Sequence, residues 1–425
     1  MIKKFIFLFF LIFLFLSESL FADGENLTVR IAVLGPGDEL YLWWGHIALV
    51  IDDSDNDRSR FYDYGLFSFE NDNFFVNFAF GRLLYSCGAS STYSNLASYV
   101  YTNRDITIYT LDLPPEKRVE IMNFAETNVL PENRDYYYHH FRDNCSTRIR
   151  DIVDLMTDGQ FFEQYGSTKG RYTLRQHVRR HTWFSPAIDW ILNFWMGQVI
   201  DTDITVWDEM FLPSEVGRCL ENFTYADSNG VRRKLVTSVD EVYKSQGRPA
   251  VLDVPRRQWP RELVFSCALS AIFCFFFILQ KKNHRIGKIL AGVSMSLAGF
   301  IFGFAGLLLY FFNIFTNHDY TYQNYNMLFA TPLLLAAVPF GICYAKTKSE
   351  DKLVFYSAFL RLIWLVTALG IFVSMLIKLF PPFFQQNLTD QMLFLPIALV
   401  FTFHPAGLKD VLRKYYAKFL IIRKK

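Results

Sequence analysis

One cysteine of this chain stands where a nucleophile is expected. Cys145 follows Asn144 and opens a segment, residues 145–156, whose apolar residues recur at helical spacing. A helix N-terminus carries partial positive charge and free N–H groups, which favour thiolate over thiol and can stabilise an oxyanion. The position of Cys145 therefore predicts attack of a thiolate on an acyl carbonyl. The alternative is an inert or disulfide-bonded cysteine.

A histidine and an aspartate earlier in the chain supply the groups that such a thiolate needs. His46 lies just before the short β-rich run 47–51, and Asp63 lies on the run 60–64, which can return as a second strand. A histidine can act as base and then as acid, and a third polar group fixes its tautomer. The hairpin predicts Asp63 beside His46. The alternatives are a structural histidine and an aspartate that flanks a turn.

The elements that must position these residues predict an α+β domain with a small antiparallel sheet. Strands are expected at 29–34, 47–51, 60–64 and 105–111. Two helices are expected, one from Pro114-Pro115 to about Val129 and one over 145–156.

Composition limits the class of protein. The chain has 425 residues, 45 of them Phe, and 52% of it is hydrophobic, which argues against a disordered chain and against an ordinary cytosolic enzyme. A net charge of +2 gives no electrostatic reason to expect a nucleic-acid partner. The six cysteines include no CxxC pair, and neither a Walker loop nor GxGxxG occurs, so no metal or cofactor is expected. Cys87 and Cys219 can pair with each other or stay free.

Targeting signals divide the chain. Residues 1–22 are predicted to form a signal peptide, with Lys3 and Lys4 before a 5–16 apolar run that is too short for a comfortable span; a retained anchor is the alternative. An exported catalytic domain is expected over 23–255 and a transmembrane domain over 256–425. About five spans are predicted, at residues 263–279, 289–312, 328–345, 353–377 and 392–404.

Loop charge sets the orientation of these spans. Lys and Arg crowd the loops after the first and third spans and the tail after the fifth, whereas the opposite loops carry only Lys378. The basic loops are therefore expected in the cytoplasm. The protein is predicted to be a multi-pass protein of the cytoplasmic membrane with its large domain on the periplasmic side.

Several blocks together resemble a known family. They are Trp44-Gly45-His46, Tyr62-Asp63-Tyr64-Gly65, Asp143 to Asp151, Asp208 to Pro213, His318, and Asn324 to Leu328. These blocks resemble the Lnb family of bacterial lipoprotein N-acyltransferases. With His46 before Cys145, the resemblance implies a circularly permuted papain-like domain. It also implies transfer of an acyl chain from a phospholipid, through a thioester on Cys145, to the N-terminal diacylglyceryl-cysteine of lipoproteins. The third catalytic position is often Asn in the similar sequences, whereas here it would be Asp63.

Further residues are candidates for substrate binding, namely Asn144, Arg148, Trp44, His318, Asn324 and Asn326. Trp44 can line an acyl groove or belong to the core, and Arg148 can instead form a salt-bridged helix face. The last three lie in an outer loop, where they can hold a lipid headgroup or close the active site. The alternative for this Tyr-rich loop is an interfacial aromatic belt.

Two other functions remain open from the sequence. One is a membrane-anchored papain-like peptidase or cell-wall amidase, and the other is a non-catalytic envelope assembly factor. A peptidase or amidase needs only one helix to anchor it in the membrane. The five predicted spans therefore favour an enzyme whose substrate is a lipid.

Overall fold

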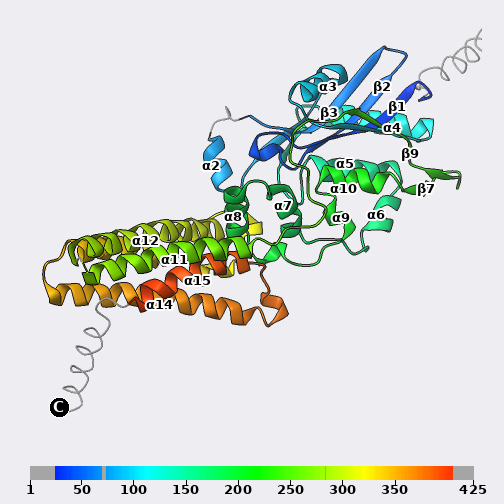
Figure 1. Ribbon diagram of the computed structural model, residues 1–425. Coiled ribbons are helices and arrows are strands. Elements are labelled where there is room, and N and C mark those ends of the chain that lie inside the picture. The colour runs from blue at the N-terminus through cyan, green and yellow to red at the C-terminus, as the bar shows by residue number, and fades with distance from the viewer. Residues whose placement is uncertain (1–23, 69–72, 283, 405–425) are drawn as a thin grey trace, which may run out of the picture. The chain divides into compact units, whose positions relative to one another are not determined.

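The computed structural model of the protein describes residues 24–68, 73–282 and 284–404, so the predicted signal peptide lies outside the described residues (Figure 1). The described chain forms two compact units. The first comprises residues up to 78, 82–172 and 203–250, and the second comprises 79–81, 173–202 and the chain from 251 onward. Residues 173–202, expected in the exported domain, thus group with the membrane helices.

The first unit is built on a seven-stranded antiparallel sheet of order β6-β4-β3-β2-β1-β5-β9. Its strands are β1 Leu27–Leu34, β2 His46–Asp53, β3 Arg58–Leu66, β4 Leu84–Ser91, β5 Ile106–Leu111, β6 Asp135–Tyr137 and β9 Val236–Tyr243. A separate pair joins β7 Thr224–Ala226 to β8 Arg232–Lys234. The predicted α+β class with an antiparallel sheet is confirmed, although the sheet has more strands than the sequence indicated. The circularly permuted papain-like topology stays a prediction.

Alternation along the strands buries both faces of this sheet. Val29 and Ile31 of β1 pack into one core with residues of α4 Pro115–Asn128, α5 Cys145–Met156 and α10 Pro213–Leu220. Ala32 and Leu34 point the other way, into a second core against α3 Thr92–Tyr101. Figure 1 shows α3 on one side of the sheet and α5 with α10 on the other. Shorter elements of the chain are η1 Leu40–Leu42, α2 Phe74–Ala79, α6 Gln160–Tyr165 and α9 Val206–Glu209.

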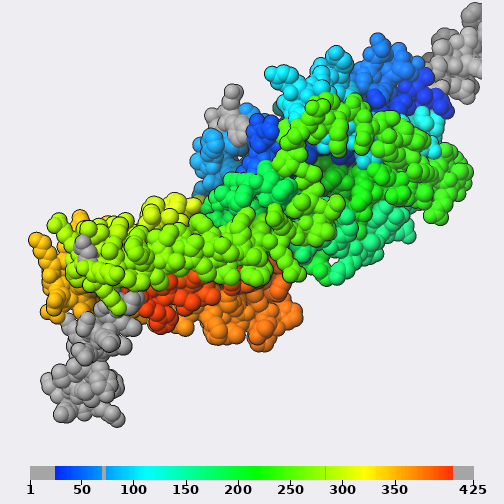
Figure 2. Space-filling model, in the orientation of Figure 1, coloured from blue at the N-terminus to red at the C-terminus, as the bar shows by residue number. Residues whose placement is uncertain are grey.

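The second unit contains the apolar helices. Three of them are long and apolar enough to cross a membrane, namely α11 Trp259–Lys282, α12 His284–Phe315 and α14 Glu350–Ile377. The shorter α15 Leu388–Phe403 matches the predicted fifth span. In Figure 2, α11 forms the upper part of the visible face of the bundle, above the red and orange of α15 and α14. Its apolar side chains Val264 and Phe265 are exposed. Such exposed apolar surface is expected of a helix that faces lipid.

The third predicted span is not one continuous helix. Its predicted start, Leu328, belongs to the separate turn η4 Tyr325–Leu328, and the helix begins only at Pro332, where η5 Pro332–Ala336 runs directly into α13 Ala337–Lys346. Pro332 explains the interruption, because a proline has no N–H to donate and disfavours helical backbone in the residue before it. The interrupted segment packs closely on α12, where a Cβ on Gly303 would lie 2.6 Å from the backbone nitrogen of Leu335.

Residues 173–202 form a hydrogen-bonded polar cluster in the second unit. They comprise α7 Leu174–Thr182, α8 Pro186–Trp195 and η2 Gln198–Ile200. Arg175 is fully buried, and its Nε donates to Asp201 Oδ1 at 2.8 Å. Its terminal nitrogens donate to the carbonyls of Asn193, Met196 and Gly197. One guanidinium therefore holds the end of α8 and the turn that follows.

Replacing Arg175 by methionine is expected to destabilise the protein by about 3–5 kcal/mol, because it leaves the buried Asp201 carboxylate without its countercharge and removes one donor from each of three carbonyls. Lys169→Met is the matched control, since Lys169 pairs with Asp203 on the surface, where such a pair contributes about 0–1 kcal/mol. Thermal unfolding in uncharged detergent measures both. Equal losses in the two variants would contradict the structural role of Arg175.

Candidate active site

The hairpin of β2 and β3 brings His46 and Asp63 together, as the sequence predicted. Ala48 pairs with Asp63 across the hairpin, and His46 lies two residues earlier on the same face of β2. The Nε2 atom of His46 lies 2.9 Å from Asp63 Oδ1. A register shift after Asp63 lets the backbone N–H of Gly65 donate to the same oxygen at 2.7 Å. The carboxylate is thus fixed by its own strand and can orient the imidazole.

Electrostatics favour the charged forms of this pair. Burial alone lowers the pKa of His46, but Asp63, Tyr99 and an ionised Cys145 raise it well above the ordinary histidine value. Burial alone raises the pKa of Asp63, whereas His46, the Gly65 N–H and Arg104 lower it below the ordinary aspartate value. Within the buried pair, the interaction between the two groups thus favours the imidazolium and the carboxylate over the neutral forms.

Gly65 leaves room for the imidazole. A Cβ at this position would lie 2.7 Å from His46 Cε1 and 3.4 Å from Nδ1. Gly65 is not among the residues with positive φ, so the space beside His46, rather than the backbone, is what requires glycine. The glycine of the Tyr-Asp-Tyr-Gly block thus serves the geometry of the site.

Gly65→Ala is expected to lower activity about a hundredfold without unfolding the protein, because displacing a catalytic group by an ångström costs that much. Gly88→Ala is the matched control, since Gly88 faces Asp63 on β4 but its Cβ would meet only the side chain of Leu66. Initial rates and melting temperatures of both variants measure the effect. Wild-type activity in Gly65→Ala would show that the imidazole tolerates displacement.

Cys145 is the first residue of α5, and Asn144 caps this helix. Asn144 Oδ1 accepts from the N–H groups of Ser146 and Thr147 at 2.8 and 3.0 Å, and the Thr147 hydroxyl accepts from the Asn144 N–H. The cap accounts for the abrupt start of the helix. The cap also engages the N–H groups of Ser146 and Thr147, which were expected to be free to bind an oxyanion. The N–H of Cys145 itself is therefore the first candidate in this turn for binding the oxyanion.

All six cysteines lie in the described residues and all are free thiols, so the possible pairing of Cys87 with Cys219 is not present. Burial raises the pKa of both thiols to about 12, which makes them poor nucleophiles. Cys145 is only partly buried. It is thus the thiol of the first unit that a substrate can reach.

Cys145 belongs to the same electrostatic cluster as the pair on the hairpin. The helix that it opens, α5, packs against β2 and β3. An ionised Cys145 is one of the charges that raise the pKa of His46. The three residues predicted to form the catalytic group therefore lie in the same unit, on elements that pack together, and their joint catalytic role stays a prediction.

Two neighbours of this cluster were not predicted. The ring of Tyr99, from α3, stacks on His46 with 6.5 Å between centroids, and the Arg104 guanidinium lies over Tyr99 at 4.7 Å. Arg104 is buried and donates to the carbonyl of Gly35. Its Nη2 has no hydrogen-bond partner among the described residues. Neither residue lies in a recognisable motif, so only their packing reveals them.

Three of the predicted substrate-binding residues have structural partners in the first unit. Asn144 Nδ2 donates to the carbonyls of His140 and Phe211, in addition to the cap described above. Arg148 forms a two-bonded ion pair with Asp143. Trp44 packs edge-on against His140 with 4.8 Å between ring centroids. Their substrate-binding roles stay predictions, and these contacts fix the loop that precedes Cys145.

The other three predicted residues lie in the second unit. Asn324 Nδ2 donates to the carbonyls of Phe194 and Trp195 at the end of α8. Asn326 Nδ2 donates to Phe194 and to Asp390 Oδ2 at 2.9 Å. His318 Nδ1 lies 2.7 Å from the hydroxyl of Tyr320. The two asparagines join α8 to the helical bundle. Contact of all three residues with substrate stays a prediction.

The two parts of the sequence match two family models. Residues 20–180 match the model described as the Lnb N-terminal periplasmic domain, and residues 258–404 match the Lnb transmembrane domain. The chain is a multi-pass membrane protein with a periplasmic N-terminal domain. It belongs to the Lnb family, which confirms the resemblance inferred from its motifs.

Membership of this family suggests a lipoprotein N-acyltransferase role with lipoprotein substrates. Searches of curated proteins and of solved structures returned no match.

Proposed function

We propose that the protein is a thiol acyltransferase that moves an acyl chain from a phospholipid to the N-terminal diacylglyceryl-cysteine of lipoproteins. The observation that carries this proposal is the cluster of His46, Asp63 and Cys145, with an aspartate-bound imidazole and a thiol at a capped helix N-terminus. A nucleophile, a base and a group that orients the base are what covalent acyl transfer requires.

In the first half-reaction, the Cys145 thiolate attacks an ester carbonyl of the phospholipid. Because Asp63 engages Nε2 of His46, Nδ1 is the ring nitrogen left to exchange a proton. As the tetrahedral intermediate collapses, the ester C–O bond breaks, and the His46 imidazolium gives its proton to the leaving alkoxide. The products are a lysophospholipid and a thioester on Cys145. The Cys145 N–H and the partial positive charge of the α5 N-terminus stabilise the intermediate oxyanion.

In the second half-reaction, the α-amino group of the lipoprotein attacks the thioester. His46, now neutral, accepts a proton from the attacking nitrogen, the C–S bond breaks, and the thiolate is restored. The product is an amide at the lipoprotein N-terminus. Ping-pong kinetics are expected, because the lysophospholipid leaves before the acceptor reacts.

The role of Asp63 predicts a shift in pH dependence. Since Asp63 raises the pKa of His46, Asp63→Asn should lower that pKa. Activity needs the imidazolium in the first step, so the alkaline limb of the pH–rate profile should move to lower pH. Asp52→Asn is the control, because Asp52 lies on the same hairpin and is not among the groups that shift the pKa of His46. An unmoved alkaline limb in Asp63→Asn would assign that limb to another group.

The proposal as a whole is tested by mass spectrometry of lipoprotein N-termini from cells with and without the gene. N-acylated termini should disappear with the gene and return when it is restored. Unchanged N-acylation would refute the transferase assignment. A hydrolase would instead release fatty acid from phospholipid at the same rate with and without the lipoprotein acceptor.

A further inference from the structure

The second unit contains a cavity of about 540 Å³ that the mechanism above does not use. Its walls come from the start of α11, the end of α14, the start of α15 and the segments around Arg179 and Gln386. Because the basic loops mark the opposite end of the bundle as cytoplasmic, these helix ends lie on the periplasmic side. The cavity therefore lies at the periplasmic ends of the predicted spans, the region of a span that is next to lipid headgroups.

The charge of the lining is one-sided. Three cationic side chains, Arg179, Arg257 and Lys378, line the cavity, and none of its described lining residues is acidic. Three carboxylates lie behind the wall: Asp201 is already paired with Arg175, and the charges of Asp189 and Asp390 act on Arg179 and Lys378. Three cations without a carboxylate among them favour an anion, and a phosphate diester suits such a site.

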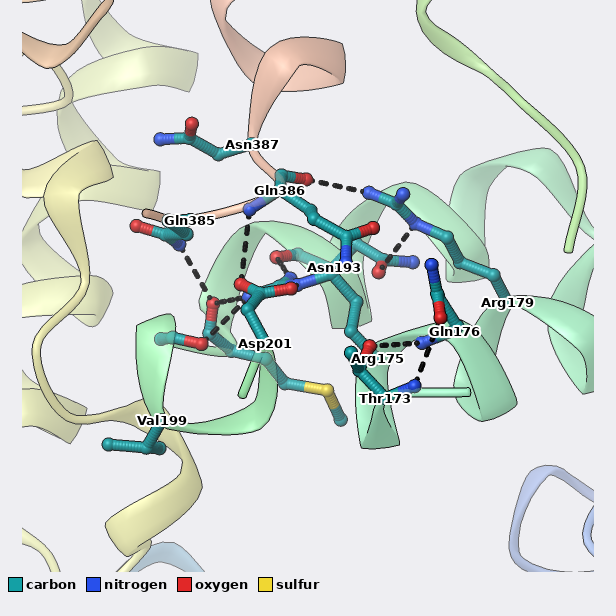
Figure 3. Close-up of polar contacts among 12 residues, drawn as sticks. Thr173, Arg175, Gln176, Arg179, Asn193, Val199, Asp201, Gln385, Gln386 and Asn387 are labelled. Atoms are coloured by element: carbon teal, nitrogen blue, oxygen red, sulfur yellow. Dashed lines mark hydrogen bonds and ion pairs between the residues drawn. The ribbon is translucent and has the colours of Figure 1, made fainter. Parts of the chain in front are cut away.

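Two of the cations are held in place. Arg179 donates through Nε to Asn193 Oδ1 at 3.1 Å and through a terminal nitrogen to the carbonyl of Gln386 at 2.8 Å, as Figure 3 shows. Lys378 Nζ donates to Gln391 Oε1 at 3.0 Å. Each side chain retains further N–H groups, because a guanidinium has five and an ammonium three. The donors are thus preorganised rather than recruited from a mobile surface.

A buried acceptor also lines the cavity. Gln258 is only 5% exposed, and its Oε1 has no hydrogen-bond partner among the described residues. A buried amide oxygen without a donor costs free energy unless a ligand supplies one.

The rest of the wall is apolar. Trp259, Met375, Phe384 and Leu388 line the cavity beside the polar groups. Inorganic phosphate would leave this surface unused, whereas the glycerol backbone and first methylenes of a lipid would cover it. From these observations we propose that the cavity binds the phosphate headgroup and glycerol backbone of a membrane phospholipid, for which phosphatidylglycerol is the probe.

The test measures binding to the full-length protein in uncharged detergent by isothermal titration calorimetry. The probes are dihexanoylphosphatidylglycerol, dihexanoylglycerol, which lacks the phosphate, and inorganic phosphate. The phospholipid should bind at least about tenfold more tightly than dihexanoylglycerol or inorganic phosphate, because only the phospholipid contacts both the cationic and the apolar lining residues. Equal affinity for dihexanoylglycerol, or for inorganic phosphate, would overturn the assignment.

Variants locate the binding. Arg257→Gln with Lys378→Gln should weaken binding of the phospholipid at least about tenfold, because two charge-assisted contacts are lost. Arg257 is exposed, so Arg257→Gln alone tests the site without risk to folding and should weaken binding about threefold. Arg256→Gln is the matched control, since Arg256 is the exposed neighbour that does not line the cavity. Equal affinities for the Arg257 and Arg256 variants would refute the site.

This inference does not depend on the proposed acyl transfer. Cys145→Ala should bind the phospholipid as the wild type does, because every lining residue belongs to the second unit and Cys145 to the first. Loss of transfer with retained binding would leave the cavity assignment intact. Retained transfer in that variant would refute the mechanism and not the cavity.

Discussion

Cys145→Ala is expected to lower the rate of acyl transfer by on the order of a thousandfold or more, because no other group can form the thioester. The fold should survive, since the side chain lost is small and partly exposed. The helix start should also survive, because its cap comes from Asn144 and Thr147. Purified variant, phospholipid and a diacylated lipopeptide suffice to measure the rate.

The controls for this variant are other cysteines. Cys219→Ala and Cys267→Ala remove a buried thiol of the first unit and an exposed thiol of the second. Both should keep transfer within about a factor of two, since surface and small core changes outside the site leave its geometry unchanged. Transfer that persists in Cys145→Ala would exclude the thioester.

His46→Gln is expected to reduce transfer by about 10²–10⁴-fold, the usual contribution of a positioned acid–base group. Glutamine keeps a polar group near Asp63 but cannot shuttle a proton. Both half-reactions should slow, because His46 donates a proton in the first and accepts one in the second. Single-turnover measurements of lysophospholipid release and of amide formation separate the two effects.

His284→Gln supplies the comparison, since His284 is an exposed histidine at the start of α12. It should transfer acyl chains at the wild-type rate. If His46→Gln slowed only the second half-reaction, the assignment of the proton in the first would be wrong.

Local signals account for the parts of the site that the sequence predicted. A short polar turn between two β-rich runs fixed the hairpin, and its register places Asp63 beside His46. The helical period of the apolar residues located the start of α5 at Cys145, and the structure adds the Asn144 cap that fixes it. Each signal acts over a few residues, which is the range over which sequence patterns are most informative.

The remaining features depend on contacts between distant residues. β4 contains three serines and a glycine, so its β-propensity is weak, and it becomes a strand through pairing with β3. Tyr99 and Arg104 reach His46 and Asp63 through packing of α3 on the sheet. Asn324 reaches carbonyls about 130 positions earlier in the chain. Spacing along the sequence carries no information about such contacts.

The central claim is that an acyl chain resides on the sulfur of Cys145 between the two half-reactions. Intact-mass spectrometry of the purified protein, incubated with phospholipid and no acceptor, tests it most directly. The account predicts a mass increase of one acyl group that maps to the Cys145 peptide, that neutral hydroxylamine removes, and that disappears when lipopeptide is added. Lipopeptide acylation at the normal rate with no such adduct, or an adduct on another residue, would contradict it.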